Sequence, residues 1–223
     1  MASRIYWIGD STVQQNRIDT WPQCGIGQML EWYLRPGVEV YNYARNGRST
    51  KSFWEEGRFE AVERELSAGD VLLIQFGHND QKREDPARYS SPEDYQANLL
   101  RYADFARKVG ALPVLITPVT RRRFEGDKLT ASLEPYPQAM GELAHRENIP
   151  LIDLYAISRA LIERQGEQAS RAFYMVFGPG EYPNYPQGRD DNTHLRSDGA
   201  LWYAGVVAEG LRALGAPYES LLL

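Results

Sequence analysis

Residues Ile5 to Val13 read Ile-Tyr-Trp-Ile-Gly-Asp-Ser-Thr-Val, and the rest of the chain is organised around this segment. Its apolar run ends at Ile8, and Gly9-Asp10-Ser11 then predicts a turn after a short buried strand. In open α/β sheets, ligands bind in the crevice outside the carboxyl ends of the strands. The pattern therefore places the Ser11 hydroxyl at a binding edge, while the alternative is that Ser11 caps the next helix.

The rest of the chain alternates strands with helices. Further strands are predicted at residues 38–43, 70–76, 113–117 and 149–154, and helices at 26–34, 52–66 with a break near Gly57, 91–109, 136–147, 155–164 and 196–214. The run at 70–76 is almost continuously apolar, as in a strand buried on both faces. Repeated alternation implies right-handed crossovers and a parallel sheet covered on both sides. We therefore predict one three-layer α/β/α domain over residues 1–223, with a parallel five-stranded sheet.

Composition and charge exclude several classes of protein. The chain is 43% hydrophobic and 25% charged, as ordinary globular proteins are. Its net charge of −5 argues against general nucleic-acid binding. A single cysteine, Cys24, excludes an intrachain disulfide and any multi-cysteine metal site. No apolar leader precedes the first strand and no run is long enough to span a membrane, so we expect a cytoplasmic protein without a membrane partner.

Two long segments are predicted to be loops. Residues 120–133 are charged, and residues 173–192 contain three prolines, three glycines and several aromatic residues. A structureless segment as long as the second is uncommon unless it has a function. We therefore expect residues 173–192 to form a wall of a binding site.

Polar or small residues follow the first three predicted strands. Ser11 follows the first, Gly47 lies in the loop after the second, and Asn79 follows the third. Because the carboxyl ends of parallel strands share one edge, a hydroxyl, a glycine amide and a carboxamide should meet there. These groups are the parts of a nucleophile and an oxyanion hole. Taken singly, Gly47 is equally a turn glycine and Asn79 an ordinary loop residue, but their joint placement favours a site.

A serine nucleophile needs a general base, and the chain has three histidines. His145 stands among charged residues of a predicted helix and is expected at the surface. His78 lies in the third loop and is expected to contact substrate. His194 follows Asp191 by three residues, which lets that carboxylate accept a hydrogen bond from Nδ1. The alternative is that residues 190–193 only cap the last helix.

Together these residues resemble those of the SGNH hydrolases, also called GDSL esterases. The four residues behind the name fall on Ser11, Gly47, Asn79 and His194, and the aspartate partner falls on Asp191. The resemblance covers nearly the whole chain and implies a flavodoxin-like α/β/α fold. The Gly-x-Ser-x-Gly elbow of α/β-hydrolases is absent, which disfavours that other fold.

Three finer features resemble one subgroup, the rhamnogalacturonan acetylesterases, which remove acetyl groups from pectin backbones. They are Thr12 directly after Gly-Asp-Ser, the block Asn-Gly-Arg-Ser-Thr-Lys-Ser-Phe at 46–53, and Phe-Gly-His-Asn-Asp at 76–80. The resemblance implies a small-molecule or oligosaccharide partner. With no export signal, imported oligosaccharides are expected rather than polymer.

The resemblance also implies a mechanism. Ser11 Oγ attacks the acetyl carbonyl with His194 as general base, and the oxyanion is held by the amides of Ser11 and Gly47 and the side chain of Asn79. His194 then protonates the departing sugar hydroxyl, and water cleaves the acetyl-enzyme. The resemblance implies no metal and no organic cofactor.

Galacturonate units in pectin carry carboxylates, which arginine binds bidentately. The candidate partners are Arg48, Lys51 and the run Arg121, Arg122 and Arg123, which follows the fourth strand. The alternative is that these residues are solvated surface charge.

Two other functions stay open. One is an SGNH esterase, lipase or deacetylase that acts on another short-acyl substrate, such as xylan oligosaccharide. The polar loops near the proposed site disfavour a lipase channel. The other is a flavodoxin-like binding module without catalysis, and no phosphate-binding glycine motif follows a strand to support it.

Overall fold

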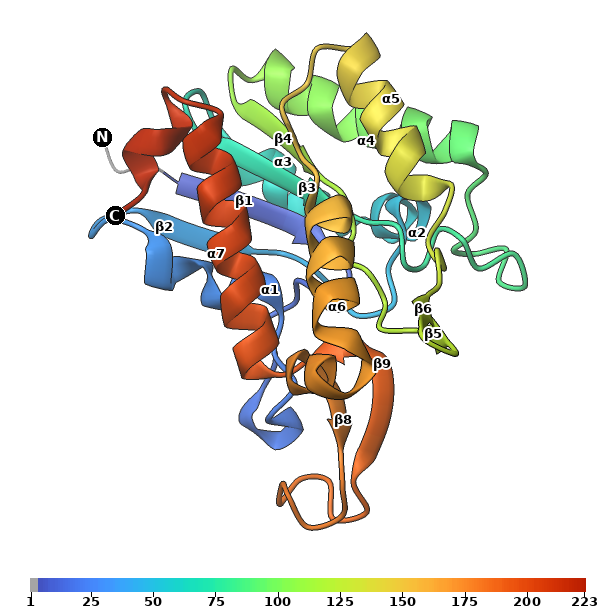
Figure 1. The fold of residues 1–223 in the computed structure, drawn as a ribbon. Coiled ribbons are helices and arrows are strands. Elements are labelled where there is room, and N and C mark those ends of the chain that lie inside the picture. Colours follow the sequence, from blue (N-terminus) through green and yellow to red (C-terminus); the bar gives the residue numbers. More distant parts are fainter. Residues whose placement is uncertain (1–3) are drawn as a thin grey trace.

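The computed structural model describes residues 4–223 and shows a central sheet of five parallel strands (Figure 1). In spatial order the strands are β2 (Glu39–Asn42), β1 (Arg4–Gly9), β3 (Val71–Gln75), β4 (Leu112–Ile116) and β7 (Leu151–Ile152). This is the flavodoxin-like order, in which the direction of winding reverses between β1 and β3. The predicted three-layer α/β fold with a five-stranded parallel sheet is confirmed.

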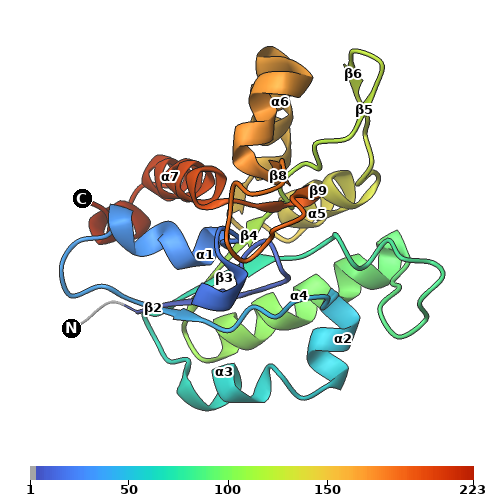
Figure 2. The same ribbon diagram turned by 90° about the horizontal axis from the view of Figure 1, so that it is seen from below.

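Helices cover both faces of this sheet (Figure 2). One face carries α1 (Ile26–Met29), α6 (Leu154–Ser170) and α7 (Ser197–Ala213). The other carries α2 (Thr50–Glu55), α3 (Glu60–Glu65), α4 (Pro92–Lys108) and α5 (Tyr136–Arg146). Short 3₁₀ helices lie at Ile18–Thr20, Leu30–Tyr33, Arg171–Phe173 and Tyr218–Leu221.

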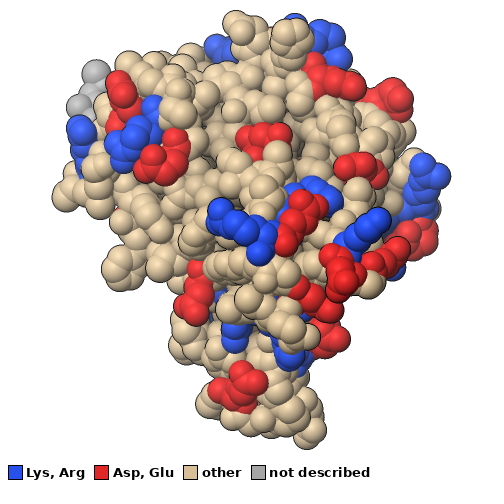
Figure 3. All heavy atoms as spheres, viewed as in Figure 1, with Lys and Arg blue, Asp and Glu red and all other residues tan. Residues whose placement is uncertain are grey.

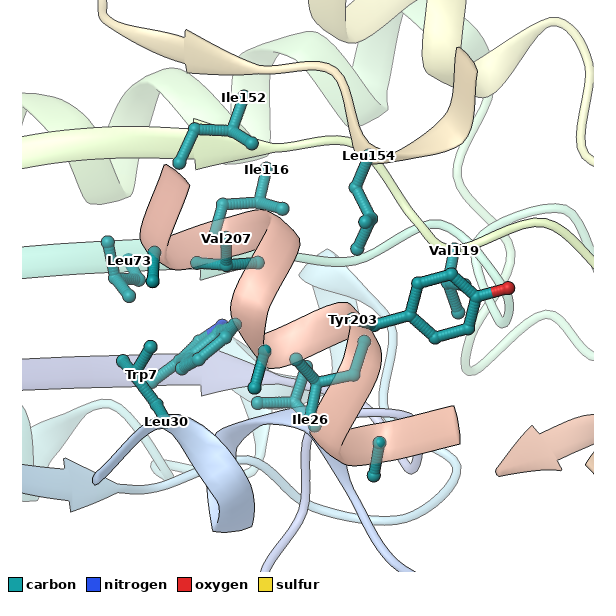
Figure 4. Packing of buried hydrophobic residues seen from close by; sticks show 14 of the residues in the cluster. Trp7, Ile26, Leu30, Leu73, Ile116, Val119, Ile152, Leu154, Tyr203 and Val207 are labelled. Atoms are coloured by element: carbon teal, nitrogen blue, oxygen red, sulfur yellow. The ribbon is translucent and has the colours of Figure 1, made fainter. Parts of the chain in front are cut away.

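Alternate residues of β1 enter the two hydrophobic layers. Trp7 packs in the layer under α7 with Val207 and Ile26 (Figure 4), whereas Tyr6 and Ile8 belong to the opposite layer. All five side chains are fully buried. Each of the aliphatic ones, Ile8, Ile26 and Val207, contributes about 1.5–3 kcal/mol by leaving water. Because both faces of the strand are covered, its sequence is apolar throughout and does not alternate.

The predicted helices differ from the observed ones at their ends. The segment 26–34 is split into the short α1 and a 3₁₀ helix. The helix that starts after β7 reaches Ser170 and not Arg164, passing a non-helical Gly166 with φ of 72°. The break predicted near Gly57 is present between α2 and α3.

The prediction that residues 173–192 form a loop is wrong. Antiparallel strands β8 (Tyr174–Phe177) and β9 (Arg189–Leu195) lie in this region, joined by a tip at 178–188. The apolar β8 is fully covered, which stabilises it as a strand beside a tip rich in proline and glycine. Residues 120–133 likewise contain a small hairpin, β5 (Phe124–Glu125) with β6 (Lys128–Leu129). Figure 1 shows β8 and β9 projecting from the body of the domain.

Charged side chains of both signs are interspersed over the face shown in Figure 3. The excess of five acidic groups over basic ones is therefore not gathered in one acidic area on that face. Among the helices of residues 4–223, none is both long and apolar enough to cross a membrane.

Candidate active site

A tight turn after β1 presents the Ser11 hydroxyl. The N–H groups of Val13 and Gln14 both donate to the Asp10 carbonyl, at 3.2 and 3.1 Å. Gly9 is needed at the start of this turn, since a Cβ there would lie 2.7 Å from the carbonyl oxygen of Gln75 on β3. No helix begins at this turn, so Ser11 does not have the capping role that was its alternative.

The structure brings the predicted nucleophile, base and acidic partner together, so that Ser11, His194 and Asp191 form one continuous series of contacts. His194 Nε2 lies 2.9 Å from Ser11 Oγ, and His194 Nδ1 lies 2.7 Å from Asp191 Oδ2. A carboxylate at Nδ1 fixes the tautomer that leaves the Nε2 lone pair facing the serine. The arrangement is therefore chemically able to take a proton from the Ser11 hydroxyl.

A bulge in β9 aims His194 at the serine. Tyr174 of β8 pairs with Leu195, but the next residue, Met175, pairs with Asp191. Residues 192–194 consequently have no counterpart on β8. A bulge of this kind redirects the side chains of the bulged strand. The aspartate oxygen Oδ1 closes it by accepting the N–H groups of residues 193 and 194, at 3.0 and 3.1 Å.

Asp190 and its neighbours do not cap the last helix. They belong to β9, and α7 begins at Ser197 with Arg196 as its N-cap residue. Asp190 accepts a hydrogen bond from Asn192 instead, at 3.2 Å, and makes none with His194. The choice of Asp191 over Asp190 as the partner of His194 therefore matches the geometry.

The surroundings of Asp191 favour its charged form. Burial alone would raise the pKa of this carboxyl, but hydrogen bonds from the His194 ring and from the N–H groups of Thr193 and His194 outweigh burial. They hold the pKa of Asp191 well below its usual range. Arg189 adds a further donor, with Nη2 at 3.0 Å from Asp191 Oδ2.

Three groups able to stabilise an oxyanion lie beside the serine. Within the described residues, the N–H groups of Ser11 and Gly47 donate to no acceptor. The Asn79 carboxamide uses one of its two hydrogens on the Arg48 carbonyl, at 3.0 Å, and keeps the other. Gly47 has φ of +73°, a conformation that glycine adopts without strain. Together with His194, these residues line a cavity of about 440 Å³.

A second, buried histidine–aspartate pair supports the Ser11 turn. Asp10 Oδ1 accepts from the N–H and Oγ1 of Thr12 at 2.9 and 2.8 Å, and Asp10 Oδ2 lies 3.3 Å from His78 Nδ1. Burial opposes the charge on Asp10, but His78 and Thr12 outweigh burial and lower the pKa of Asp10. Burial lowers the pKa of His78, and the Asp10 carboxylate opposes that shift. His78 lines the cavity, and its contact with substrate stays a prediction.

A buried carboxyl joins the second and third loops. Asp80 Oδ1 accepts from the N–H and Oγ1 of Thr50, at 2.9 and 2.5 Å. Its other oxygen has no hydrogen-bond partner among the described residues. Burial raises the pKa of Asp80 to about 7. This carboxyl is therefore held in place by Thr50 but poorly solvated.

Two of the predicted carboxylate partners lie outside the cavity. The Arg48 guanidinium pairs with Glu56 at 2.9 Å, and the Lys51 ammonium donates to the Pro86 carbonyl at 2.9 Å. Neither side chain lines the cavity that holds Ser11.

The arginine run separates into three environments. Arg121 lines the cavity with Ser11. Arg122 is buried on the far side of β9, where it donates to the Glu167 carbonyl, Ser170 Oγ and Asn192 Oδ1. Arg123 is exposed and lines neither this cavity nor the cavity of about 480 Å³ beside Arg122. Of the run, the geometry keeps only Arg121 as a candidate for substrate contact.

Sequence reasoning missed five residues that line the cavity. They are Gln23, Asn46, Lys82, Arg189 and Thr193. Two of them could have been predicted from their closeness in sequence to a predicted site residue, because Asn46 precedes Gly47 and Lys82 follows Asn79 by one turn. Residues 4–223 contain no cluster of three or more His, Cys, Asp or Glu that could hold a metal ion. Independence from metals stays a prediction.

Sequence comparison finds one family over most of the chain. A model of the GDSL-like lipase/acylhydrolase family matches residues 7–202. Rhamnogalacturonan acetylesterase RhgT of Bacillus subtilis is 43% identical over 221 residues, covering 99% of this chain and 94% of that protein. The probable rhamnogalacturonan acetylesterase YesY of the same organism is 38% identical over 224 residues, covering 100% of this chain and 99% of that protein.

Solved structures share the fold. Protein YxiM of Bacillus subtilis superposes with a TM-score of 0.82 at 26% identity, covering 97% of this chain and 58% of that chain. Axe2, an acetylxylan esterase from Geobacillus stearothermophilus, superposes with a TM-score of 0.64 at 17% identity, covering 97% of this chain and 95% of that chain.

Proposed function

Since the chain belongs to the GDSL-like lipase/acylhydrolase family and is a serine esterase, we propose that it removes O-acetyl groups from pectic, rhamnogalacturonan-type oligosaccharides. The observation that carries the proposal is the line Asp191–His194–Ser11, with contacts of 2.7 and 2.9 Å, at the wall of a cavity. The acetyl and pectic specificity is supported by relatives of nearly equal length named rhamnogalacturonan acetylesterases.

The first step is attack by Ser11 Oγ on the acetyl carbonyl carbon. His194 Nε2 takes the hydroxyl proton, and the ionised Asp191 stabilises the imidazolium that forms. The negative charge moves to the former carbonyl oxygen. The unpartnered N–H groups of Ser11 and Gly47 and the free amide hydrogen of Asn79 stabilise it, and one such donor is worth about 2.7–4 kcal/mol.

The second step releases the sugar. His194 returns its proton to the departing sugar oxygen, and the bond between that oxygen and the acetyl carbon breaks. A water molecule then attacks the acetyl-enzyme, again with His194 Nε2 as base, so acetate leaves and Ser11 regains its proton. All of these proton transfers use one nitrogen, which is 2.9 Å from Ser11 Oγ.

The cavity suits a small acyl group on a polar alcohol. It is lined mainly by polar or charged side chains, and aliphatic side chains are not among its lining residues. A lipase needs an apolar channel for a long acyl chain, which this lining does not provide. The lining thus favours acetyl esters of sugars over lipid esters.

A substrate panel tests the proposal. Acetate release is measured from acetylated rhamnogalacturonan oligosaccharides and from acetylated xylan oligosaccharides of similar length. We expect kcat/KM on the pectic substrate to be higher by about tenfold or more, the value of one charged hydrogen bond. A preference for xylan would instead identify a deacetylase of another polysaccharide. Failure to react with a fluorophosphonate, together with no ester hydrolysis, would support a binding module.

A further inference from the structure

We infer that Lys82 and Arg121 form a carboxylate-binding pair that selects uronate-bearing substrates. The inference rests on the proposed function, since it names how the same cavity recognises its sugar. Both residues line the cavity that holds Ser11. Within the described part of the chain, neither forms an ion pair with a carboxylate.

Arg121 is anchored but not neutralised. Its Nη2 donates to the His78 carbonyl at 3.2 Å. The Gln81 carboxamide oxygen also accepts from Nη2, at 3.0 Å, in the orientation that satisfies both ends of that amide. Burial lowers the pKa of Arg121, and the more distant carboxylates of Asp10 and Asp191, which form no ion pair with it, only partly oppose that shift. The guanidinium is thus held in position with its positive charge unpaired, ready for an anionic group in the cavity.

Lys82 brings a second positive charge to the same wall. Its backbone N–H donates to the Asn79 carbonyl at 3.2 Å, so one turn carries both residues. The side chain makes no hydrogen bond or ion pair with residues 4–223. Burial and repulsion by Arg88 and Arg121 lower the pKa of Lys82. Two like charges therefore repel each other here, and an anion bound between them would relieve the repulsion.

These contacts fix the side of the cavity on which the carboxylate should bind. Arg121 is held through His78 and Lys82 through Asn79, which follow each other after β3. Among the described residues that line the cavity, Asp191 is the single acid, and His194 and Arg189 already occupy its Oδ2. The carboxylate would therefore bind on the Asn79 side, away from Asp191. That position places the uronate carboxylate beside the oxyanion donors.

The neighbouring arginines provide a contrast and a control. Arg122 faces the other side of β9 and is saturated by carbonyl, hydroxyl and carboxamide oxygens. Arg123 is exposed, and its side chain makes no hydrogen bond within residues 4–223. Arg123→Gln removes the same charge from the same segment without touching the cavity. It is the matched control for Arg121→Gln.

The first experiment needs no acetylated pectin. Hydrolysis of p-nitrophenyl acetate is inhibited with free galacturonate, with galactose as the uncharged counterpart. We expect galacturonate to inhibit at concentrations where galactose does not. In Lys82→Gln and Arg121→Gln the inhibition constant should rise by about tenfold or more, whereas Arg123→Gln should change it by less than about twofold. Salt should weaken the inhibition in the unaltered protein only modestly, because the pair is partly buried.

The second experiment measures selectivity. kcat/KM is compared between acetylated rhamnogalacturonan oligosaccharide and the same oligosaccharide with its carboxyl groups reduced to alcohols. The ratio should fall by about tenfold or more in Lys82→Gln and in Arg121→Gln, and Arg121→Lys should recover part of it. Using the ratio removes any general loss of activity from altered folding.

The outcomes separate the two proposals. If the unaltered protein prefers the charged substrate but both variants keep its selectivity and its inhibition by galacturonate, the carboxylate pair is wrong and the pectic activity stands. If galacturonate inhibits through Lys82 and Arg121 but no acetylated pectin is cleaved, the pair is right and the proposed substrate is wrong. Equal inhibition by galacturonate and galactose would overturn the pair outright.

Discussion

The two halves of the candidate site are built on different parts of the fold. Ser11, Gly47 and Asn79 follow β1, β2 and β3 of the central sheet. Asp191 and His194 lie on β9, in a two-stranded hairpin outside that sheet. The topology of the sheet positions the sheet-borne half, because the loops that follow parallel strands all lie at the carboxyl-terminal edge of the sheet. The hairpin-borne half is positioned by a local bulge.

The two halves also differ in what holds them. Buried carboxyl groups fix the sheet-borne loops, since Asp10 holds Thr12 and Asp80 holds Thr50. Backbone contacts at the end of β9 fix the hairpin, since the Cys24 N–H donates to the Leu195 carbonyl at 2.9 Å. Buried carboxyl groups beside the sheet therefore support the sheet-borne loops, whereas the Asp191 carboxylate and hydrogen-bonded backbone support the hairpin-borne half. Substitutions in the two halves should show this difference.

Removing the nucleophile should have the largest effect. Ser11→Ala takes away the hydroxyl that is proposed to form the covalent bond, so kcat should fall by a factor on the order of 10⁶. Because the Ser11 side chain contributes no backbone contact to the turn, the Tm should stay close to that of the unaltered protein. Steady-state acetate release and thermal unfolding are the measurements. Retention of a few per cent of the activity would remove Ser11 from its proposed role.

The next largest loss of kcat should come from a substitution in the hairpin-borne half. Asp191→Asn keeps the shape but loses the anion at His194 Nδ1, so kcat should fall by about 10⁴. Asp190→Asn is the matched control, since its exposed carboxylate accepts a hydrogen bond from Asn192 and none from His194, and the change should leave kcat within about twofold. Equal losses in the two variants would mean that the substitutions act through the β9 bulge and not through His194.

Much of this arrangement is predictable from sequence, and the reason differs between the halves. Three predicted strands followed by loops that hold Ser11, Gly47 and Asn79 are enough to place the sheet-borne half, because the topology of parallel sheets is restricted. Asp191 and His194, which the sequence pairs, are in contact in the structure, but the sequence does not reveal the strand that carries them. The bulge depends on pairing with β8, which is a tertiary contact.

The charged residues were the hardest to predict. Arg121, Arg122 and Arg123 are identical in the sequence, yet one lines the cavity, one is buried against Ser170 and one is exposed. No residue type or spacing distinguishes them, because the path of the chain between β4 and β5 decides which way each points. Lys82 differs from them, because its place one turn after Asn79 was a usable signal.

A smaller effect should follow from loss of one oxyanion donor. Asn79→Ala removes the amide hydrogen beside Ser11 and should lower kcat by about 10²–10³ with little change in KM. The reason is that this donor acts mainly on the charge that develops in the transition state. Initial rates over a range of substrate concentrations distinguish this outcome from an effect on KM, which would assign Asn79 to ground-state binding.

The last prediction concerns stability and tests whether burial favours the protonated form of Asp80, the carboxyl that supports the sheet-borne half. The Asp80 carboxyl has its pKa raised to about 7 by burial, above its value of about 4 in the unfolded chain. The folded protein therefore binds this proton more tightly than the unfolded chain does. The stability contributed by Asp80 is complete below about pH 4 and is lost as the pH rises through about 7, a change on the order of 4 kcal/mol at most.

Asp80→Asn makes this position neutral at every pH and should remove that loss. The free energy of unfolding in urea, measured at about pH 5 and about pH 8, should then fall less with pH in Asp80→Asn than in the unaltered protein. Asp190→Asn, which changes an exposed carboxylate, should keep the original pH dependence. If the curves of Asp80→Asn and the unaltered protein run parallel between these pH values, folding does not change the protonation of Asp80 in that range. Burial would then not raise the pKa of Asp80, and the prediction would be wrong.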